Sequence, residues 1–194
     1  MNNEEISALS YNDWVKYKKE NLPKLLNTYP NFDFKTRFEI MKNFKSITEK
    51  AGISLYLANG VLLGAVREKD FISWDDDVDM DVLIEELEPK YEMIKEQLIS
   101  LGYIVRGIEK HPEMKINVYY GGEKVGILAL YLKGDFRIRS SYKWPRSFYE
   151  EFEEIVFKGE TFKTPKINDY LNHQYGTDWN TPKKKNYFNK DVFR

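Results

Sequence analysis

Apolar residues recur at helical spacing in two long segments of the chain. In residues 34–51 they fall at three- and four-residue steps, which predicts an amphipathic helix that ends at Gly52. The stripe consists of Phe38, Met41, Phe44, Ile47 and Ala51. A second stripe, over residues 87–101, predicts another amphipathic helix with Leu101 on its buried side and Gly102 as its stop. Each helix should therefore pack one face against the rest of the fold.

Short apolar and alternating segments predict strands. We expect them over residues 53–58, 78–84, 103–106, 114–120, 124–132 and 153–157. The segments 114–120 and 124–132 are joined by Gly121-Gly122, which is typical of a hairpin. Shorter helices are expected over residues 11–20, over residues 61–67, and from a cap at Asn168 to Tyr175. This order of elements predicts an α+β (α/β) domain with a mixed β-sheet flanked by helices.

The chain divides most simply into three parts: an N-terminal arm (1–33) packed on the domain, one domain (34–182), and a basic tail (183–194). The net charge is −1, from 30 basic and 31 acidic residues, so we expect no nucleic-acid partner. Zero cysteines exclude thiolate catalysis and disulfides. No signal-peptide pattern and no long apolar stretch are present, so we expect no transmembrane segment and a cytoplasmic location, with peripheral membrane contact as an open alternative.

Acidic residues are concentrated in one short segment. It contains Asp75, Asp76, Asp77, Asp79 and Asp81. Asp77 and Asp79 alternate with apolar residues, so on a strand they share a face, with Cα atoms roughly 6.5–7 Å apart. Two carboxylates at that spacing can share one hard cation, Mg²⁺ or Mn²⁺, which brings substrate phosphates with it. A solvated acidic turn is the alternative, but the mutual repulsion of these charges favours a ligand.

A glycine turn precedes this acidic strand. Gly60 lies between an expected strand and an expected helix, where the backbone can approach a phosphate at the helix N-terminus. Val61 follows it and offers its backbone N–H to a phosphate, and Arg67 and Lys69 are available to neutralise phosphate oxygens. The alternatives are an ordinary structural turn and two solvated surface cations.

Longer motifs around these residues resemble a known family. They are GVLLGAVR at residues 60–67, FISWDDDVDM at 71–80, WPRSFY at 144–149 and YGTDWNTP at 175–182. Together they resemble the LicD-type phosphocholine transferases and the fukutin-like proteins, over residues 38–182. The resemblance implies a nucleotidyltransferase-like fold and transfer of a phospho-alcohol from a CDP-linked donor to a glycan. It also implies that Asp77 and Asp79 are the metal-binding catalytic pair and that Gly60 is the phosphate-turn glycine.

Two departures from the family pattern stand out. Val61 replaces the hydroxyl residue that usually follows the turn glycine, and Gly126 stands where the third carboxylate is expected. Asn117 or Asp135 are possible substitutes by position for that carboxylate. Asp76 and Asp81 are the alternative bases for the acceptor hydroxyl.

Aromatic and basic residues complete the set of candidate substrate contacts. The candidates are Trp74, Asp75, Asp76, Asp81, Tyr142, Trp144 and Arg146, with Arg137 and Arg139 as further phosphate ligands. The aromatic rings can stack on a base or enclose a quaternary ammonium. Each ring has core packing as its alternative role.

Three functions are compatible with this sequence. The first is a metal-dependent transferase that moves a phosphocholine-like group from a CDP-alcohol to a glycan or glycolipid. The second is nucleotidyl transfer to a small molecule or sugar. The third is a non-catalytic binding protein on a degraded site, which the changes at Val61 and Gly126 favour.

Overall fold

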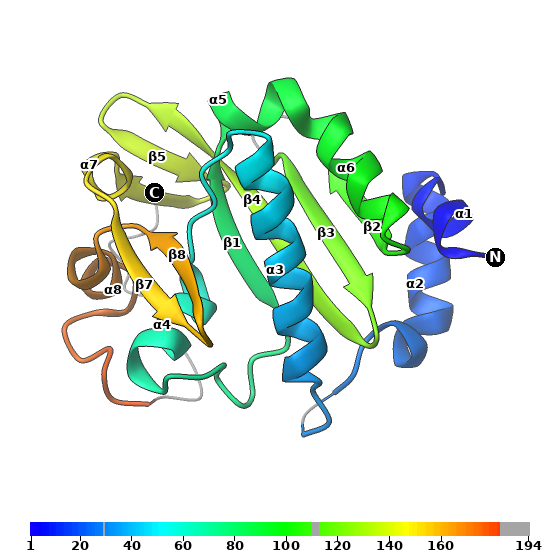
Figure 1. Ribbon diagram of the computed structural model, residues 1–194, viewed down its shortest axis with the longest axis horizontal. Coiled ribbons are helices and arrows are strands. Elements are labelled where there is room, and N and C mark those ends of the chain that lie inside the picture. Colours follow the sequence, from blue (N-terminus) through cyan, green and yellow to red (C-terminus); the bar gives the residue numbers. More distant parts are fainter. Residues whose placement is uncertain (29, 110–112, 183–194) are drawn as a thin grey trace.

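A six-stranded mixed sheet forms the centre of the fold (Figure 1). The computed structural model describes residues 1–28, 30–109 and 113–182, so the expected tail over residues 183–194 lies outside the described residues. The strands are β1 (Val78–Leu83), β2 (Ile104–Ile108), β3 (Lys115–Tyr120), β4 (Glu123–Lys133), β5 (Phe136–Arg139) and β6 (Tyr142–Pro145). Neighbours in the order β2-β3-β4-β5-β6 are antiparallel, and β1 pairs with β4 in parallel. The mixed β-sheet predicted from the sequence is therefore confirmed.

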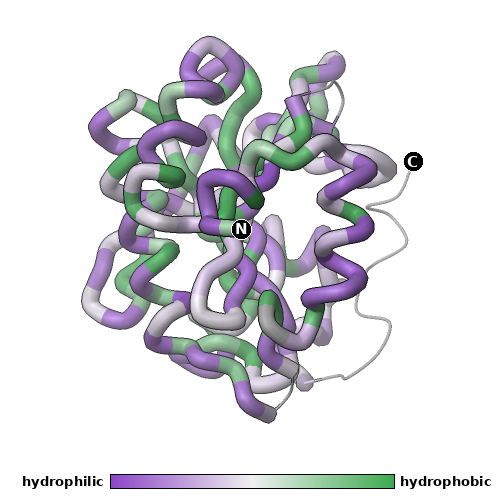
Figure 2. The backbone as a smooth tube through the Cα atoms, turned by 90° about the vertical axis from the view of Figure 1, so that its right-hand side faces the viewer, coloured by the Kyte–Doolittle hydropathy of each residue, from purple (hydrophilic) through white to green (hydrophobic). Residues whose placement is uncertain are grey.

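Helices and a small hairpin surround this sheet. The helices are α1 (Asn3–Ser7), α2 (Tyr11–Leu25), α3 (Phe34–Lys50), α4 (Asn59–Arg67), α5 (Ile84–Leu87), α6 (Tyr91–Ser100), α7 (Ser147–Glu150) and α8 (Ile167–Tyr175), with a 3₁₀ turn η1 (Glu88–Lys90). β7 (Glu153–Phe157) and β8 (Glu160–Thr164) form a separate hairpin. Hydrophilic and hydrophobic residues alternate along the outer helices, as expected when one face packs inward (Figure 2). Within the described residues, no helix is long and apolar enough to cross a bilayer.

The two faces of the sheet are covered by different segments. On one face, Val78 and Met80 of β1 join the main core with residues of α3 and α6. Because side chains alternate along a strand, Asp79 points to the opposite face. Part of that opposite face is covered by α2, whose Trp14 packs on Tyr119 of β3 with ring centroids 5.2 Å apart. The N-terminal segment therefore packs on the same face of the sheet as the one that carries Asp79.

The expected strand over residues 53–58 is wrong. This segment forms only isolated bridges, from Tyr56 to Asp81 and from Tyr56 to Lys163. The Tyr56 N–H donates to the Asp81 carbonyl at 2.9 Å, and the Leu57 N–H donates to the Lys163 carbonyl at 2.7 Å. The segment turns from one neighbour to the other within two residues, so no ladder develops.

The expected helix over residues 87–101 is interrupted. Pro89 falls in η1, because proline lacks the N–H that a continuous helix needs, and α6 begins only at Tyr91. Leu101 is the C-cap residue and is 49% exposed, so its predicted burial is wrong. It lies beyond the last full turn, where the apolar stripe no longer faces the core. Gly102 follows with φ 82°, in the left-handed region that favours glycine.

The last helix begins before its predicted cap. α8 starts at Ile167 and Lys166 is the N-cap, so Asn168 lies inside the helix. The Ile167 N–H donates to the Glu153 carboxylate at 3.1 Å. A side chain distant in sequence therefore satisfies one of the free N–H groups of the first turn, and no local cap is needed. The helices over 34–51 and 61–67 and the hairpin of residues 114–132 are confirmed within one or two residues at their ends.

Candidate functional site

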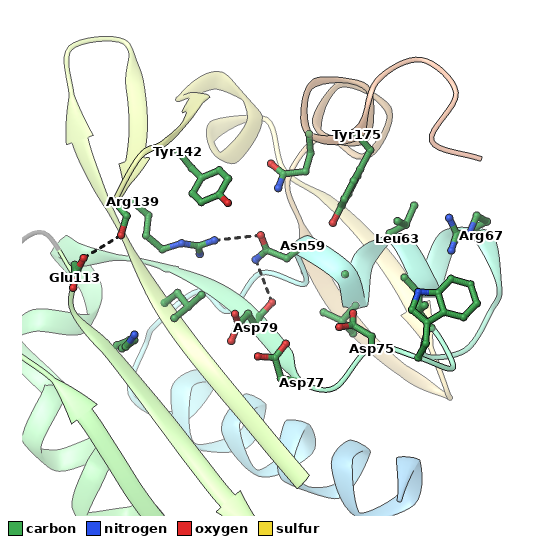
Figure 3. Close-up of a pocket in the computed structure, with 18 of the residues that line it drawn as sticks. Asn59, Leu63, Arg67, Asp75, Asp77, Asp79, Glu113, Arg139, Tyr142 and Tyr175 are labelled. Atoms are coloured by element: carbon green, nitrogen blue, oxygen red, sulfur yellow. Dashed lines mark hydrogen bonds between the residues drawn. The ribbon is translucent and has the colours of Figure 1, made fainter. Parts of the chain in front are cut away.

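A pocket of about 580 Å³ lies where the start of β1, the first turn of α4, the β5–β6 hairpin and α8 meet (Figure 3). Asp75, Asp77 and Asp79 line its lower wall, and Arg139 and Tyr142 line the wall formed by the hairpin. These acidic residues come from one short segment, whereas the basic and aromatic residues come from a hairpin about 60 residues later in the chain. The pocket therefore brings together segments that are far apart in the sequence.

Asp79 of β1 and Asp77, the residue just before that strand, form an acid pair on the face opposite the core. Burial, and then the negative charge of Asp77, raises the pKa of Asp79 to about 6. Burial, and then the charge of Asp77, likewise raises the pKa of Asp75 to about 7. The buried Asp79 Oδ1 has no hydrogen-bond partner among the described residues. Burial and mutual repulsion disfavour the anionic form of these carboxylates, and a nearby cation favours it.

Asp81 does not line the pocket but supports residues that do. Its predicted roles as a base or substrate contact are therefore wrong. Its side chain is fully buried. It accepts hydrogen bonds from Arg139 Nη1 at 2.6 Å, from the Tyr149 hydroxyl at 2.7 Å and from Asn59 Nδ2 at 3.3 Å. Arg139 Nη2 also donates to Asn59 Oδ1 at 3.2 Å (Figure 3). Asp81 therefore holds Arg139 and the first residue of α4 in fixed positions at the pocket wall.

The first turn of α4 lies against an acidic side chain. A Cβ at Gly60 would lie 2.2 Å from Asp75 Oδ2, so only glycine allows the carboxylate to rest there. Asn59 starts the helix with φ 52°, and Asn59 Nδ2 donates to the Asp79 carbonyl at 3.3 Å. The positive end of the helix favours negative charge at this position. Val61 also lines the pocket, although the residue is only 3% exposed and packs mainly in the core.

Gly126 lies directly beside the acid pair. In the parallel pairing of β1 with β4, Gly126 is the partner of Asp79, and across β3 it is the partner of Asn117. A Cβ at this glycine would lie 2.6 Å from Asn117 Oδ1 and 3.1 Å from Asp79 Oδ1. The asparagine amide thus fills the space that a side chain at position 126 would occupy. Of the two possible substitutes for the third carboxylate, Asn117 is beside the acid pair, whereas Asp135 lies in the β4–β5 turn and does not line the pocket.

Several predicted contacts lie away from the pocket. Trp144 is fully buried and donates from Nε1 to Gln174 Oε1 at 2.8 Å, so its proposed contact with substrate is wrong. Arg146 is exposed and pairs with Glu150 at 2.9 Å. Lys69 is exposed after the end of α4 and does not line the pocket.

Of the other predicted residues, two line the pocket and two do not. Asp76 is exposed outside it, although carboxylate oxygens of Asp75, Asp76 and Asp77 all lie within 4.8 Å of one another. Trp74 and Arg67 line the pocket, and Arg67 pairs with Glu68 at 2.6 Å. Arg137 does not line the pocket; it pairs with Glu85 at 2.7 Å.

Two cations near the acids were missed in the sequence. Lys124 Nζ lies 2.5 Å from Asp77 Oδ2 and 3.9 Å from Asp79 Oδ1. Arg37 is fully buried, pairs with Glu123 at 2.6 Å and donates from Nη1 to the Asp75 carbonyl at 2.8 Å. The strand alternation of residues 124–132 signals that Lys124 and Gly126 share a face, but only the pairing of β4 with β1 brings that face to the acids.

The acid pair has the ligand chemistry that a hard divalent cation requires. One carboxylate oxygen of each aspartate, Asp77 Oδ2 and Asp79 Oδ1, lies within 4 Å of the Lys124 ammonium nitrogen. Asp79 Oδ1 has no hydrogen-bond partner among the described residues. Mg²⁺ and Mn²⁺ prefer carboxylate oxygens, so the residues present fit such an ion.

Comparison with known proteins gives a family match. Residues 52–167 match the model of the LicD/FKTN/FKRP nucleotidyltransferase domain. An uncharacterised protein of Rickettsia typhi is 29% identical over 147 residues, which cover 71% of this chain and 45% of that protein. The lipopolysaccharide cholinephosphotransferase LicD of Haemophilus influenzae is 46% identical over 41 residues, which cover 21% of this chain and 16% of that protein. The chain thus spans less than half the length of these curated relatives.

Solved structures give weaker similarities. The solution structure of the antibiotic-resistance factor ANT(2'')-Ia matches with a TM-score of 0.49 and 14% identity, covering 69% of this chain and 66% of that chain. The Cid1 poly(U) polymerase matches with a TM-score of 0.37 and 14% identity, covering 62% of this chain and 37% of that chain.

Proposed function

Because this chain belongs to the LicD/FKTN/FKRP nucleotidyltransferase-domain family, we propose that it is a metal-dependent transferase. It moves a phosphocholine-like phospho-alcohol from a CDP-linked donor to a glycan or glycolipid acceptor. The observation that carries the proposal is the acid pair at the start of β1, which lines a pocket together with Arg139 of the β5–β6 hairpin. The local similarity to a lipopolysaccharide cholinephosphotransferase supports the choice of a phosphocholine-like group.

In this proposal Asp77 and Asp79 hold Mg²⁺ or Mn²⁺. When bound, the metal offsets negative charge on the donor diphosphate and its leaving nucleotide phosphate. Arg139 is held by Asp81 at 2.6 Å and presents its guanidinium to the pocket, where it binds a phosphate oxygen. Because its position is fixed before substrate arrives, little ordering is required during the reaction.

Two further features of the pocket have roles in the proposal. Asp75 lines the pocket, with a carboxylate oxygen within 4.8 Å of one of Asp77, and it is the carboxylate placed to accept the proton of the acceptor hydroxyl. It takes the role that a side chain at Gly126 would have had. Trp74, Tyr142 and Tyr175 also line the pocket and provide aromatic faces for the base or for a quaternary ammonium.

A thermal-shift titration tests this proposal without the acceptor. The full chain is mixed with Mg²⁺ or Mn²⁺ and with CDP-choline, CDP-ribitol, CTP or ATP, and the Asp77→Asn/Asp79→Asn variant is measured beside it. We expect a metal-dependent rise in Tm with a CDP-alcohol, lost in the double variant, because a ligand that binds the folded state stabilises it by mass action. Asp135→Asn, which removes one carboxylate from the β4–β5 turn, is the control and should behave as wild type.

The remaining outcomes separate the alternatives. A shift with CTP or ATP and none with a CDP-alcohol would favour nucleotidyl transfer, in which an NTP releases pyrophosphate. No shift with any nucleotide would contradict a donor site here and favour the non-catalytic binding protein.

A further inference from the structure

A lysine side chain of the same chain, Lys124, lies beside the acid pair. Lys124 lies on β4, on the same face as Gly126, and its side chain is 21% exposed. Its Nζ donates to Asp77 Oδ2 at 2.5 Å and lies 3.9 Å from Asp79 Oδ1. A single ammonium group therefore lies within 4 Å of both carboxylates to which a divalent cation would bind.

The strand pairing fixes this lysine in place. Residues 125 and 126 of β4 are the register partners of residues 78 and 79 of β1, so Lys124 extends from the position next to Asp77. On the other side, Lys124 is paired with Tyr119, a ring that α2 covers through Trp14. The lysine thus has its acidic partners on one side and a packed aromatic side chain on the other.

An ammonium group and a metal ion at this position compete for the same oxygens. A Mg²⁺ or Mn²⁺ ion needs direct bonds to carboxylate oxygens at about 2.0–2.2 Å. The Asp77 oxygen in contact with Lys124 can make such a bond only if the ammonium group moves away. A metal ion and an ammonium group in contact with the same oxygen would repel each other strongly.

We propose that Lys124 is the counter-cation of the metal-free acid pair and that a divalent cation binds by displacing it. The inference depends on the metal site in the proposed function and adds the residue that sets its affinity. Lys124 stabilises the acidic strand when metal is absent and weakens metal binding by the same interaction. Lys124 is thus a positioning residue that controls occupancy of the site.

Direct Mn²⁺ binding to the full chain, without nucleotide, tests the inference. Free Mn²⁺ is followed by electron paramagnetic resonance during titration of wild type, Lys124→Met, Lys124→Gln and Lys124→Arg. Removing the positive charge should tighten Mn²⁺ binding by about tenfold or more, because the ion no longer displaces a charged group. Lys124→Arg keeps the charge and should bind within about threefold of wild type. Lys133→Met, which removes a charge from the exposed end of the same strand, is the matched control and should leave the affinity unchanged.

A stability measurement accompanies the titration. Without metal, Lys124→Met should have a lower Tm than wild type, and Mn²⁺ should raise its Tm by more than it raises that of wild type. Lys124→Gln retains a hydrogen-bond donor toward Asp77, so it provides a second neutral variant if the methionine variant does not fold.

The outcomes distinguish this inference from the proposed function. Tighter Mn²⁺ binding by a neutral variant supports displacement, including the case in which wild type binds too weakly to measure. Equal affinity in wild type and both neutral variants, with binding lost in Asp77→Asn/Asp79→Asn, overturns the role of Lys124 and leaves the metal site in place. No Mn²⁺ binding by any variant overturns both.

Discussion

Replacing Arg37 by methionine should greatly reduce the stability of the fold. The guanidinium is fully buried, with Nε donating to Glu123 Oε2 at 2.8 Å and Nη2 2.6 Å from the same oxygen. Glu123 also accepts from the Asp33 N–H at 2.6 Å and from Asn27 Nδ2 at 3.1 Å. Methionine fills a similar volume but leaves the glutamate buried without a cation. The Nη1 bond to the Asp75 carbonyl, 2.8 Å long, is lost as well.

The size of the effect follows from this burial. Breaking a buried ion pair by removing one partner costs about 3–5 kcal/mol, because the remaining charge stays away from water. The whole folded state of such a domain is worth about 5–15 kcal/mol, so Arg37→Met removes a large share of it. Arg37→Met/Glu123→Leu removes both charges and should recover part of the loss.

Urea unfolding followed by circular dichroism measures this effect. Arg146→Met is the matched control, because its pair with Glu150 is at a similar distance, 2.9 Å, but both side chains are about half exposed. An exposed pair contributes about 0–1 kcal/mol, so the control should unfold close to wild type. If Arg37→Met also lost less than about 1 kcal/mol, the buried pair would not hold the acidic segment to the sheet and the reasoning would be refuted.

Three further predictions concern the pocket and its support. Burial, followed by the neighbouring carboxylate charge, raises the pKa of Asp75 to about 7 and of Asp79 to about 6, so the folded chain binds more protons than the unfolded chain between about pH 4 and 7. Without metal, stability should therefore fall as the pH rises through that range, and Asp79→Asn should flatten the decline in urea unfolding series; a steeper decline would contradict the assignment. Trp144→Phe removes a buried N–H donor and should cost about 1–3 kcal/mol in the same assay while leaving nucleotide affinity unchanged; weaker affinity at unchanged stability would restore the tryptophan as a substrate contact. Gly126→Asp with Asn117→Ala supplies the third carboxylate and removes the 2.6 Å contact, so Mn²⁺ should bind about tenfold more tightly than to Asn117→Ala alone; equal titration curves would show that position 126 does not reach the metal.

Local patterns of the chain were sufficient to predict many elements and part of the site. The apolar stripe of residues 34–51 predicts α3, and the alternation of residues 78–84 predicts both β1 and the face that carries Asp77 and Asp79. These predictions succeed because helix and strand periodicity depend on residues only a few positions apart. The motif resemblance added the family, which the match over residues 52–167 confirms.

Contacts between segments far apart in the chain could be identified only from the tertiary structure. The parallel pairing of β1 with β4 places Gly126 beside Asp79 and Lys124 beside Asp77, although about 45 residues separate the two strands. Trp144 stacks on Tyr142 of the same strand with ring centroids 6.0 Å apart, but Trp144 is fully buried and only Tyr142 of the two lines the pocket.

The interrupted and missing elements have the same origin. The segment 53–58 has the composition of a strand, but its neighbours allow only single bridges at Tyr56. The N-terminal end of α8 is satisfied by Glu153 and not by a local cap. The chain alone therefore determined which residues carry the chemistry and the local structure on which most of them lie. The tertiary structure decided which acids reach the pocket and which cation neutralises them, because side-chain burial and strand register arise from contacts between segments far apart in sequence.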